Sequence, residues 1–195
     1  MGTAVNANAS RARINQTLLE LIVGDITKQD ADAIVNAANS SLLGGGGVDG
    51  AIHRAAGPDL LAETRALGGC QTGDAKITRG YKLKARHVIH AVGPVYRAGD
   101  ASVPRLLESA YRRSLEVAAE NDLRTLAFPS ISTGTYGYPI EEAAPISLRA
   151  VYEFALESMQ IESVRFVLYN EPILKAYQVA LDHLVRESGS QAEYA

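Results

Sequence analysis

Residues 36–53 read Asn-Ala-Ala-Asn-Ser-Ser-Leu-Leu-Gly-Gly-Gly-Gly-Val-Asp-Gly-Ala-Ile-His. The glycines from Gly44 to Gly47 are costly to order, because glycine loses more backbone entropy on folding than any other residue. Such a run persists where the backbone must approach a ligand closely or present successive N–H groups to it. A helix is predicted directly after the glycines, so its positive dipole and free amides point back toward them. The stretch therefore predicts a phosphate or ribose site, with a flexible surface turn as the alternative.

On both sides of this stretch, apolar runs alternate with amphipathic segments, which is typical of an α/β sheet covered by helices on both faces. Strands are predicted at residues 18–23, 33–38, 75–78, 86–92, 125–129 and 163–169. Helices are predicted at residues 49–56, 59–66, 103–120, 140–158 and 172–186. Without an internal repeat or a linker, we expect one domain over residues 14–187. Residues 1–13 are expected to be a disordered leader and residues 188–195 a frayed tail.

A second loop of small and hydroxylic residues also joins a predicted strand to a predicted helix. Residues 129–139 read Pro-Ser-Ile-Ser-Thr-Gly-Thr-Tyr-Gly-Tyr-Pro. Small residues let the backbone wrap a phosphate, hydroxyls add hydrogen-bond donors, and an aromatic ring offers a flat surface to a sugar. Open α/β sheets bind ligands at the carboxyl ends of their strands, so both loops are expected to line one crevice. Together they predict a ligand with a diphosphate at its centre.

Composition excludes several other kinds of site. The 19 basic and 22 acidic residues give a net charge of -3, which does not favour long-range attraction to nucleic acid or to an anionic membrane. Cys70 is the only cysteine and the histidines form no metal-binding motif, so neither a disulfide nor a bound metal is expected. No apolar run is long enough for a membrane span and the start does not resemble a signal peptide, so we expect a cytoplasmic location.

The glycine-rich stretch also permits a nicotinamide-dependent oxidoreductase, because residues 45–50 fit the G-x-G-x-x-G fingerprint. Two features argue against this alternative. Asp49 falls inside the fingerprint, where its charge would oppose a pyrophosphate at the same helix start. Asp74, the acid nearest the expected spacing, precedes a strand instead of ending one. A P-loop is excluded because no Gly-Lys-Ser/Thr occurs.

Five segments together resemble the macrodomain family, and most closely its MacroD-type hydrolases. They are residues 23–27, 36–53, 69–75, 90–94 and 130–139. The resemblance covers roughly residues 18–186, nearly the whole chain. It implies a three-layer α/β/α fold with a central mixed, mostly parallel β-sheet, and a site for ADP-ribose that needs no cofactor.

The resemblance also implies which residues hold ADP-ribose. Asp25 would accept from the adenine amino group, Ile26 would offer its backbone N–H, and Tyr169 would pack on adenine. The distal ribose and the diphosphate would be held by residues of the two loops, namely Gly46, Gly47, Val48, Ser132, Gly134, Thr135 and Tyr136. Asp25 also suits a turn or a helix cap, and Tyr169 also suits the core.

Four residues bear on whether the chain is a catalyst. In MacroD-type enzymes the residues matching Asn39 and Asp49 are needed for hydrolysis, and the aspartate is thought to activate a water or a ribose hydroxyl. A carboxylate beside a sugar hydroxyl suits a general base. Asp49 and His53 are four apart and share a helix face, so they can meet, and Asn36 and His53 would support catalysis. Asp49 as a helix cap and His53 as a structural histidine are the simpler alternatives.

The sequence therefore predicts a hydrolase that cleaves ADP-ribosyl esters, either on modified Asp or Glu side chains or in O-acetyl-ADP-ribose. A module that binds ADP-ribose without turning it over is the main alternative. A nicotinamide-dependent oxidoreductase comes third. Protein, acetyl and nucleic-acid conjugates carry the same ADP-ribose group, so all three remain open as substrates.

Overall fold

The computed structural model describes residues 10–195. Its strands are β1 (Arg11–Ile14), β2 (Thr17–Val23), β3 (Ala33–Ala37), β4 (Ala75–Arg79), β5 (His87–Ala91), β6 (Thr125–Phe128), β7 (Ser163–Leu168) and β8 (Ala192–Tyr194). Its α-helices are α1 (Gly47–Ala56), α2 (Pro58–Ala66), α3 (Ser102–Glu120), α4 (Ile140–Glu157) and α5 (Glu171–Ser188). Short 3₁₀ helices are η1 (Ile26–Lys28) and η2 (Gly189–Gln191).

The strands form one eight-stranded sheet in the order β4-β5-β3-β6-β7-β2-β1-β8. The neighbours from β5 to β2 pair in parallel, whereas β4, β1 and β8 join antiparallel at the two edges. The expected α/β/α fold with a mixed, mostly parallel sheet is therefore confirmed. Because the central strands run in the same direction, the loops that follow them lie along one edge of the sheet.

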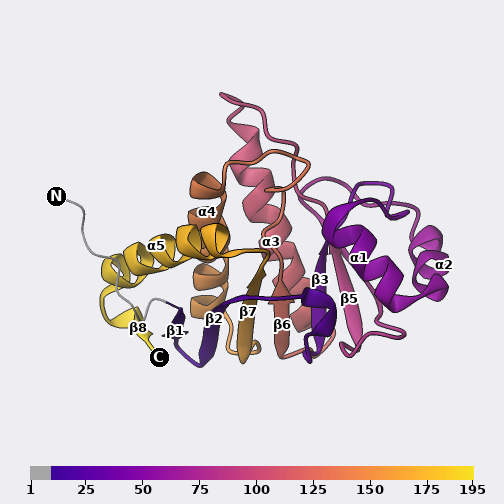
Figure 1. The fold of residues 1–195 in the computed structure, drawn as a ribbon. Helices are drawn as coiled ribbons and strands as arrows, with labels where there is room; N and C mark the ends of the chain where they lie inside the picture. The colour runs from indigo at the N-terminus through magenta and orange to yellow at the C-terminus, as the bar shows by residue number, and fades with distance from the viewer. Residues whose placement is uncertain (1–9) are drawn as a thin grey trace.

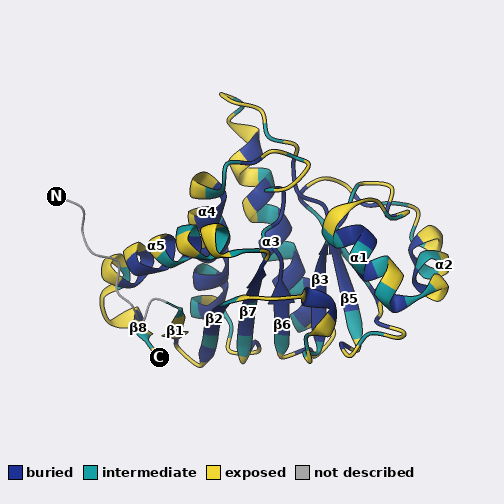
Figure 2. Cartoon of the chain, in the orientation of Figure 1, coloured by how far each residue is buried: buried dark blue, intermediate teal, exposed yellow. Residues whose placement is uncertain are grey.

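Helices cover both faces of the sheet, so its central strands are apolar on both sides. On β3, Val35 packs into the cluster that includes α3, α4 and α5 residues, and Ile34 packs into the cluster that includes α1. Figure 1 places α1 and α2 at the β3–β5 end of the sheet and α5 at the β8 end. Figure 2 shows dark blue, buried strands under helices whose outer faces are exposed.

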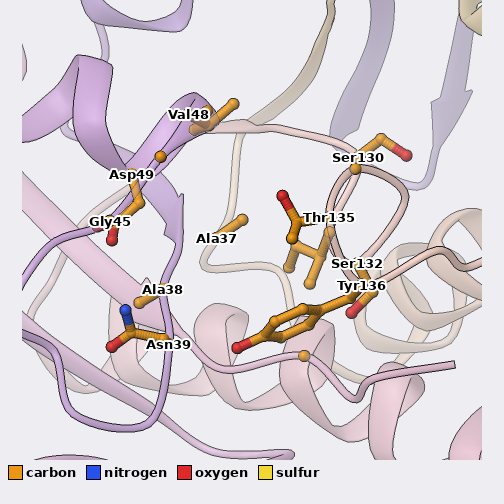
Figure 3. Close-up of a pocket in the computed structure, with 15 residues that line it drawn as sticks. Ala37, Ala38, Asn39, Gly45, Val48, Asp49, Ser130, Ser132, Thr135 and Tyr136 are labelled. Atoms are coloured by element: carbon orange, nitrogen blue, oxygen red, sulfur yellow. The ribbon is translucent and has the colours of Figure 1, made fainter.

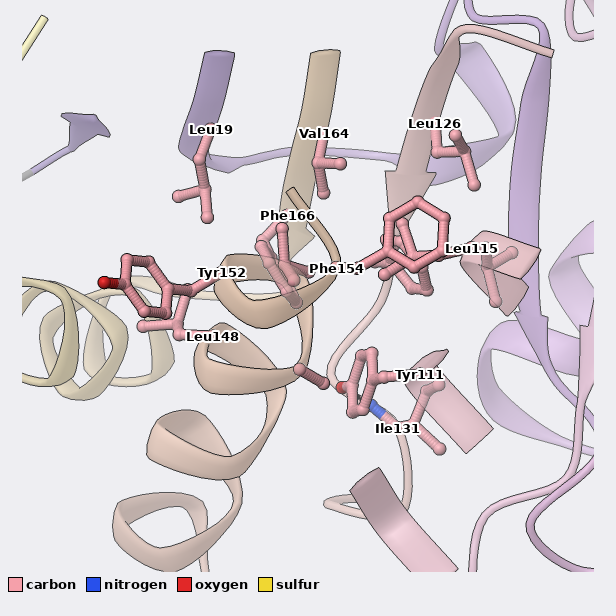
Figure 4. Close-up of a cluster of buried hydrophobic side chains, with 14 of the residues drawn as sticks. Leu19, Tyr111, Leu115, Leu126, Ile131, Leu148, Tyr152, Phe154, Val164 and Phe166 are labelled. Carbon is pink, nitrogen blue, oxygen red and sulfur yellow. Dashed lines mark hydrogen bonds between the residues drawn. The ribbon is translucent and has the colours of Figure 1, made fainter. Parts of the chain in front are cut away.

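An aromatic cluster forms the core below the second loop. The rings of Phe128 and Phe166 stack at 5.7 Å between centroids, and Tyr111 and Tyr177 pack against Phe166. Figure 4 shows Tyr111 within this cluster, with its hydroxyl joined to the backbone of Ile131. The aromatic residues thus bring two hydroxyl groups directly under the loop that follows β6.

The folded domain extends beyond both of its expected ends. Residues 11–13, expected in the leader, belong to β1, and residues 192–194, expected in a frayed tail, form β8. The two strands pair antiparallel, with Ile14 opposite Ala192, because each covers an edge that would otherwise be open. Residues 1–9 of the expected leader lie outside the described residues. Between residues 10 and 195, no helix is long and apolar enough to cross a membrane.

Candidate functional site

Four neighbouring parallel strands lead into the two loops, Asp25 and Tyr169. Asp25 and Tyr169 come just after the ends of β2 and β7, which are paired at Val23 and Leu168. The first loop (residues 38–46) follows β3, and the second loop (residues 129–139) follows β6. The sheet order β3-β6-β7-β2 places all of them along the same edge. The expectation that both loops share one crevice therefore agrees with the topology.

A cleft of about 280 Å³ lies between the two loops. Figure 3 shows Asn39 and Asp49 on one side of the cleft, opposite Ser132, Thr135 and Tyr136. The predicted site residues that line it are Asn39, Gly46, Gly47, Val48, Asp49, Ser132, Gly134, Thr135 and Tyr136. Asn36 and His53 lie behind Asp49, and Asp25, Ile26 and Tyr169 lie beyond the cleft at the ends of β2 and β7.

The first loop is held by the side chain of Asn39. Its Oδ1 accepts from the N–H of Ser41 and of Leu42, and its Nδ2 donates to the carbonyl of Gly44 at 2.9 Å. A β-carbon placed on Gly46 or Gly47 would meet no atom within 4 Å, so these glycines face open space. The loop is therefore held by side-chain hydrogen bonds on one side, while its glycine backbone is exposed to the cleft.

Asp49 is a buried carboxylate on the first turn of α1. It is 5% exposed, and its Oδ1 accepts a 2.7 Å hydrogen bond from Asn36 Nδ2 and lies 3.4 Å from His53 Nε2. Its Oδ2 has no hydrogen-bond partner among the described residues and lies on the side of Gly45 and Asn39. The helix begins at Gly47 and its N-cap is Gly46, which makes no side-chain cap, so the alternative of Asp49 as a helix cap is wrong.

Behind Asp49 lies a chain of buried polar side chains. Asn36 and His90 are both fully buried and stand opposite each other in the β3–β5 register. Asn36 Nδ2 is 3.1 Å from His90 Nδ1, and His90 Nε2 is 2.9 Å from Thr78 Oγ1. Burial first, and the nearby His53 second, lower the pKa of His90 from 6.5 to about 3, so its ring is neutral.

His90 and Thr78 were not predicted as site residues. His90 lies in a segment that supported the family resemblance, but nothing in the sequence shows that it contacts Asn36. The usable signal was its position between the apolar residues Ile89 and Ala91 of a strand, since a buried histidine needs polar partners.

The second loop rests on two buried tyrosines. The hydroxyl of Tyr111 accepts from the N–H of Ile131 at 2.8 Å and donates to the carbonyl of Pro129 at 3.3 Å. The hydroxyl of Tyr177 lies 3.1 Å from Ser130 Oγ. Burial raises the pKa of both phenols, so they remain neutral hydrogen-bonding groups. The backbone of the loop is therefore fixed from below by neutral hydroxyls.

Ser132 holds an uncommon conformation at the cleft. Its φ is 68°, in the left-handed region that side chains rarely adopt, and its Oγ is buried without a hydrogen-bond partner among the described residues. Local strain and an unpaired buried hydroxyl are both typical of functional sites. Gly93, after β5, packs so closely beneath Ser132 and Ile131 that a β-carbon there would overlap both side chains.

The other end of the site is exposed. Asp25 caps η1, its Oδ1 accepting from the N–H and the hydroxyl of Thr27, and these hydrogen bonds lower the pKa of its carboxyl. The alternative of Asp25 as a helix cap is thus confirmed, and its Oδ2 makes no hydrogen bond within residues 10–195. The side chain of Tyr169 is 85% exposed, so the alternative that it belongs to the core is wrong.

The site offers one buried carboxylate, one neutral amide behind it and many backbone and hydroxyl groups. No group of three or more potential metal ligands exists among the described residues. Such a site can bind a polar, phosphorylated ligand through its loops and can remove a proton through Asp49.

Comparison with known proteins identifies the family and the fold. Residues 35–147 match the family model described as Macro domain. The O-acetyl-ADP-ribose deacetylase of Salmonella newport (strain SL254) is 53% identical over 82% of this chain and 91% of its own. The ADP-ribose glycohydrolase MACROD2 of Xenopus laevis is 54% identical over 87% of this chain and 41% of its own. A mutant Oceanobacillus iheyensis macrodomain, solved with ADPR, superposes with a TM-score of 0.87 at 44% identity, over 90% of this chain and 98% of its own.

Proposed function

The chain belongs to the macrodomain family, and we propose that its cleft binds ADP-ribose and hydrolyses ADP-ribosyl esters, with Asp49 as the general base. The observation that carries this proposal is a buried carboxylate at the wall of a glycine-lined cleft. Asp49 is oriented by Asn36 through Oδ1, while Oδ2 is directed to the side of Gly45 and Asn39.

The ligand would lie along the carboxyl edge of the sheet. From β3 to β2 there are three strand spacings, about 14 Å, which suits an elongated molecule with a base, a diphosphate and a second sugar. Adenine would lie between Asp25 Oδ2, the Ile26 N–H and the exposed ring of Tyr169. The diphosphate would lie between Gly46, Gly47 and Val48 on one side and Ser132, Gly134 and Thr135 on the other.

The distal ribose would lie beneath Tyr136 and beside Asn39 and Asp49. Water would attack the carbon of the distal ribose that carries the ester, and Asp49 would take the proton that the water gives up. The bond from that carbon to the carboxyl oxygen would break, and its electron pair would leave with the carboxylate. The products are ADP-ribose and a free carboxylate, from a modified Asp or Glu or from an acetyl group. His53, 3.4 Å from Asp49 Oδ1, would support the carboxylate from behind.

The leaving group decides which linkages are cleaved. A carboxylate leaves without being protonated, because its conjugate acid has a pKa of about 4. A serine ether would expel an alkoxide and an arginine linkage a strongly basic guanidine, and both call for an acid or a metal. We therefore expect cleavage of acidic-residue and acetyl esters, and no cleavage of serine or arginine linkages.

The test is release of ADP-ribose from peptides that each carry one defined linkage, with and without chelator, together with calorimetric titration of ADP-ribose, AMP and a nicotinamide dinucleotide. We expect release from esters only, unaffected by chelator, and tighter binding of ADP-ribose than of the other two. Binding of ADP-ribose without release from any linkage would make the chain a reader. Rapid serine-linkage cleavage would overturn the proposed chemistry.

A further inference from the structure

One nitrogen atom connects the carboxylate at the cleft to the interior of the sheet. Asn36 Nδ2 lies 2.7 Å from Asp49 Oδ1 and 3.1 Å from His90 Nδ1. An amide nitrogen has two hydrogens and accepts nothing, so it can serve both partners at once. The second hydrogen bond is possible only if His90 Nδ1 carries a lone pair.

This requirement fixes the tautomer of His90. With Nδ1 as acceptor, the proton of the neutral ring must be on Nε2, where it donates to Thr78 Oγ1 at 2.9 Å. The hydroxyl of Thr78 then donates in turn to the carbonyl of Arg79 at 3.1 Å. Every link in the chain from Thr78 to Asp49 therefore has one donor and one acceptor, and it ends on the carboxylate.

The chain also fixes the orientation of Asn36. If the amide were turned over, its oxygen would face the oxygen of Asp49, and the two would repel. A proton on His90 Nδ1 would oppose the N–H of Asn36 in the same way. The charge of Asp49 and the lone pair of His90 thus hold the amide in one orientation from opposite sides.

We infer that His90 is a positioning residue for the reaction, which holds the Asn36 amide so that Asn36 holds Asp49 with Oδ2 directed to the cleft. Thr78 contributes by fixing the proton on Nε2. This inference rests on the proposed function, because the reaction is what the arrangement serves. His90 does not line the cleft, and its hydrogen-bonded connection to Asp49 runs through Asn36.

Two substitutions at His90 separate this role from simple filling of space. In His90→Asn, the side-chain Oδ1 occupies the position of Nδ1 and can still accept from Asn36. In His90→Gln, the polar atoms reach the position of Nε2 and the acceptor for Asn36 is lost. Both put a neutral amide into the same buried place, so each is the control for the other.

We expect His90→Asn to keep kcat on a glutamate-linked peptide within about threefold of the wild type. His90→Gln should lower kcat by about tenfold or more, because a displacement of about 1 Å at a catalytic group can cost ~100-fold. Both variants should bind ADP-ribose within about threefold of the wild type, since the cleft itself is unchanged. Equal losses of kcat, or losses confined to affinity, would overturn the inference.

A measurement on the wild-type protein needs neither variant nor turnover. Long-range ¹H–¹⁵N correlation spectra distinguish the two neutral tautomers and the charged ring of a histidine. We expect His90 to be the Nε2–H tautomer near neutral pH. A proton on Nδ1, or a charged ring, would overturn the inference even if the protein hydrolyses esters. Absence of ester hydrolysis alongside the expected tautomer would instead count against the proposed function.

Discussion

The glycine-rich wall of the cleft, Asn39 and residues 45–49, is held by polar side chains that end on a carboxylate. The opposite wall, Gly93 and residues 130–136, rests on the buried hydroxyls of Tyr111 and Tyr177. The first wall therefore presents a carboxylate to the cleft, whereas the phenols beneath the second wall stay neutral. The difference indicates a division of labour, with chemistry on the first wall and binding shared by the backbone of both.

The largest effect is expected at the carboxylate of the first wall. Asp49→Ala should lower kcat for ester cleavage by about 10²- to 10⁴-fold, the usual contribution of a general base. Affinity for ADP-ribose should stay within about tenfold, because we propose that backbone amides and not Asp49 hold the phosphates. Steady-state rates and calorimetry measure the two quantities, with Asp49→Asn as the isosteric control. A rate near that of the wild type in both variants would remove Asp49 from the mechanism.

The same comparison shows what the sequence could reveal. The glycine run and the loop of small residues could be recognised in the sequence because their chemistry is local, so the fold and most cleft residues could be predicted. The hydrogen bonds that hold the two walls could not be predicted, because they join groups that are distant in sequence. Tyr111, on α3, accepts a hydrogen bond from the backbone of Ile131. His90, on β5, is hydrogen-bonded to Asn36 on the neighbouring strand β3. The edge strand β8 was missed for a similar reason, since its three residues become a strand only by pairing with β1.

A substitution at Gly93 should disrupt the second wall of the cleft. In Gly93→Ala the new methyl group overlaps the side chains of Ser132 and Ile131, so the second loop must shift from its position at the cleft. We expect affinity for ADP-ribose to fall by about tenfold or more, while kcat at saturation falls less than it does in Asp49→Ala. Titration calorimetry and a melting curve for each protein test this. Unchanged affinity in a folded Gly93→Ala protein would show that the second wall does not bind the ligand.

The polar interior behind the first wall should also make stability depend on pH. The pKa of His90 is about 3 in the folded protein, against 6.5 for a free histidine. Between these two pH values the unfolded chain binds a proton on this histidine that the folded protein does not bind. The free energy of unfolding should therefore decrease as the pH falls below about 6.5. The titratable groups around His90 are His53 and Asp49 on α1 and Lys76, its register partner on β4.

Denaturant unfolding of the wild type and His90→Asn between about pH 7 and pH 4 isolates this contribution. The variant should lose less stability on acidification, because it lacks the histidine that must stay neutral. Asp32, whose folded pKa is about 2 against 3.8, acts in the same direction but in a lower range of pH. Identical pH dependence in the two proteins would show that His90 is not buried in its neutral form.

The smallest effect is expected at the aromatic ring of the second wall. Tyr136→Phe should change affinity for ADP-ribose by less than about threefold, because the flat ring surface that we propose to cover the distal ribose is retained. Tyr136→Ala, which removes the ring, serves as the comparison and should bind clearly more weakly. A large loss with phenylalanine, measured by calorimetry, would assign the binding to the hydroxyl instead.

The most direct test of the division of labour is single-turnover hydrolysis of a glutamate-linked peptide at increasing enzyme concentration. The wild type, Asp49→Asn and Gly93→Ala would be measured side by side, each giving a maximal rate and a half-saturating concentration. We predict that Asp49→Asn lowers the maximal rate and leaves half-saturation within about tenfold. Gly93→Ala should raise half-saturation by about tenfold or more while the maximal rate stays within about tenfold. If each variant changed both quantities to the same extent, the two walls would not have separate roles.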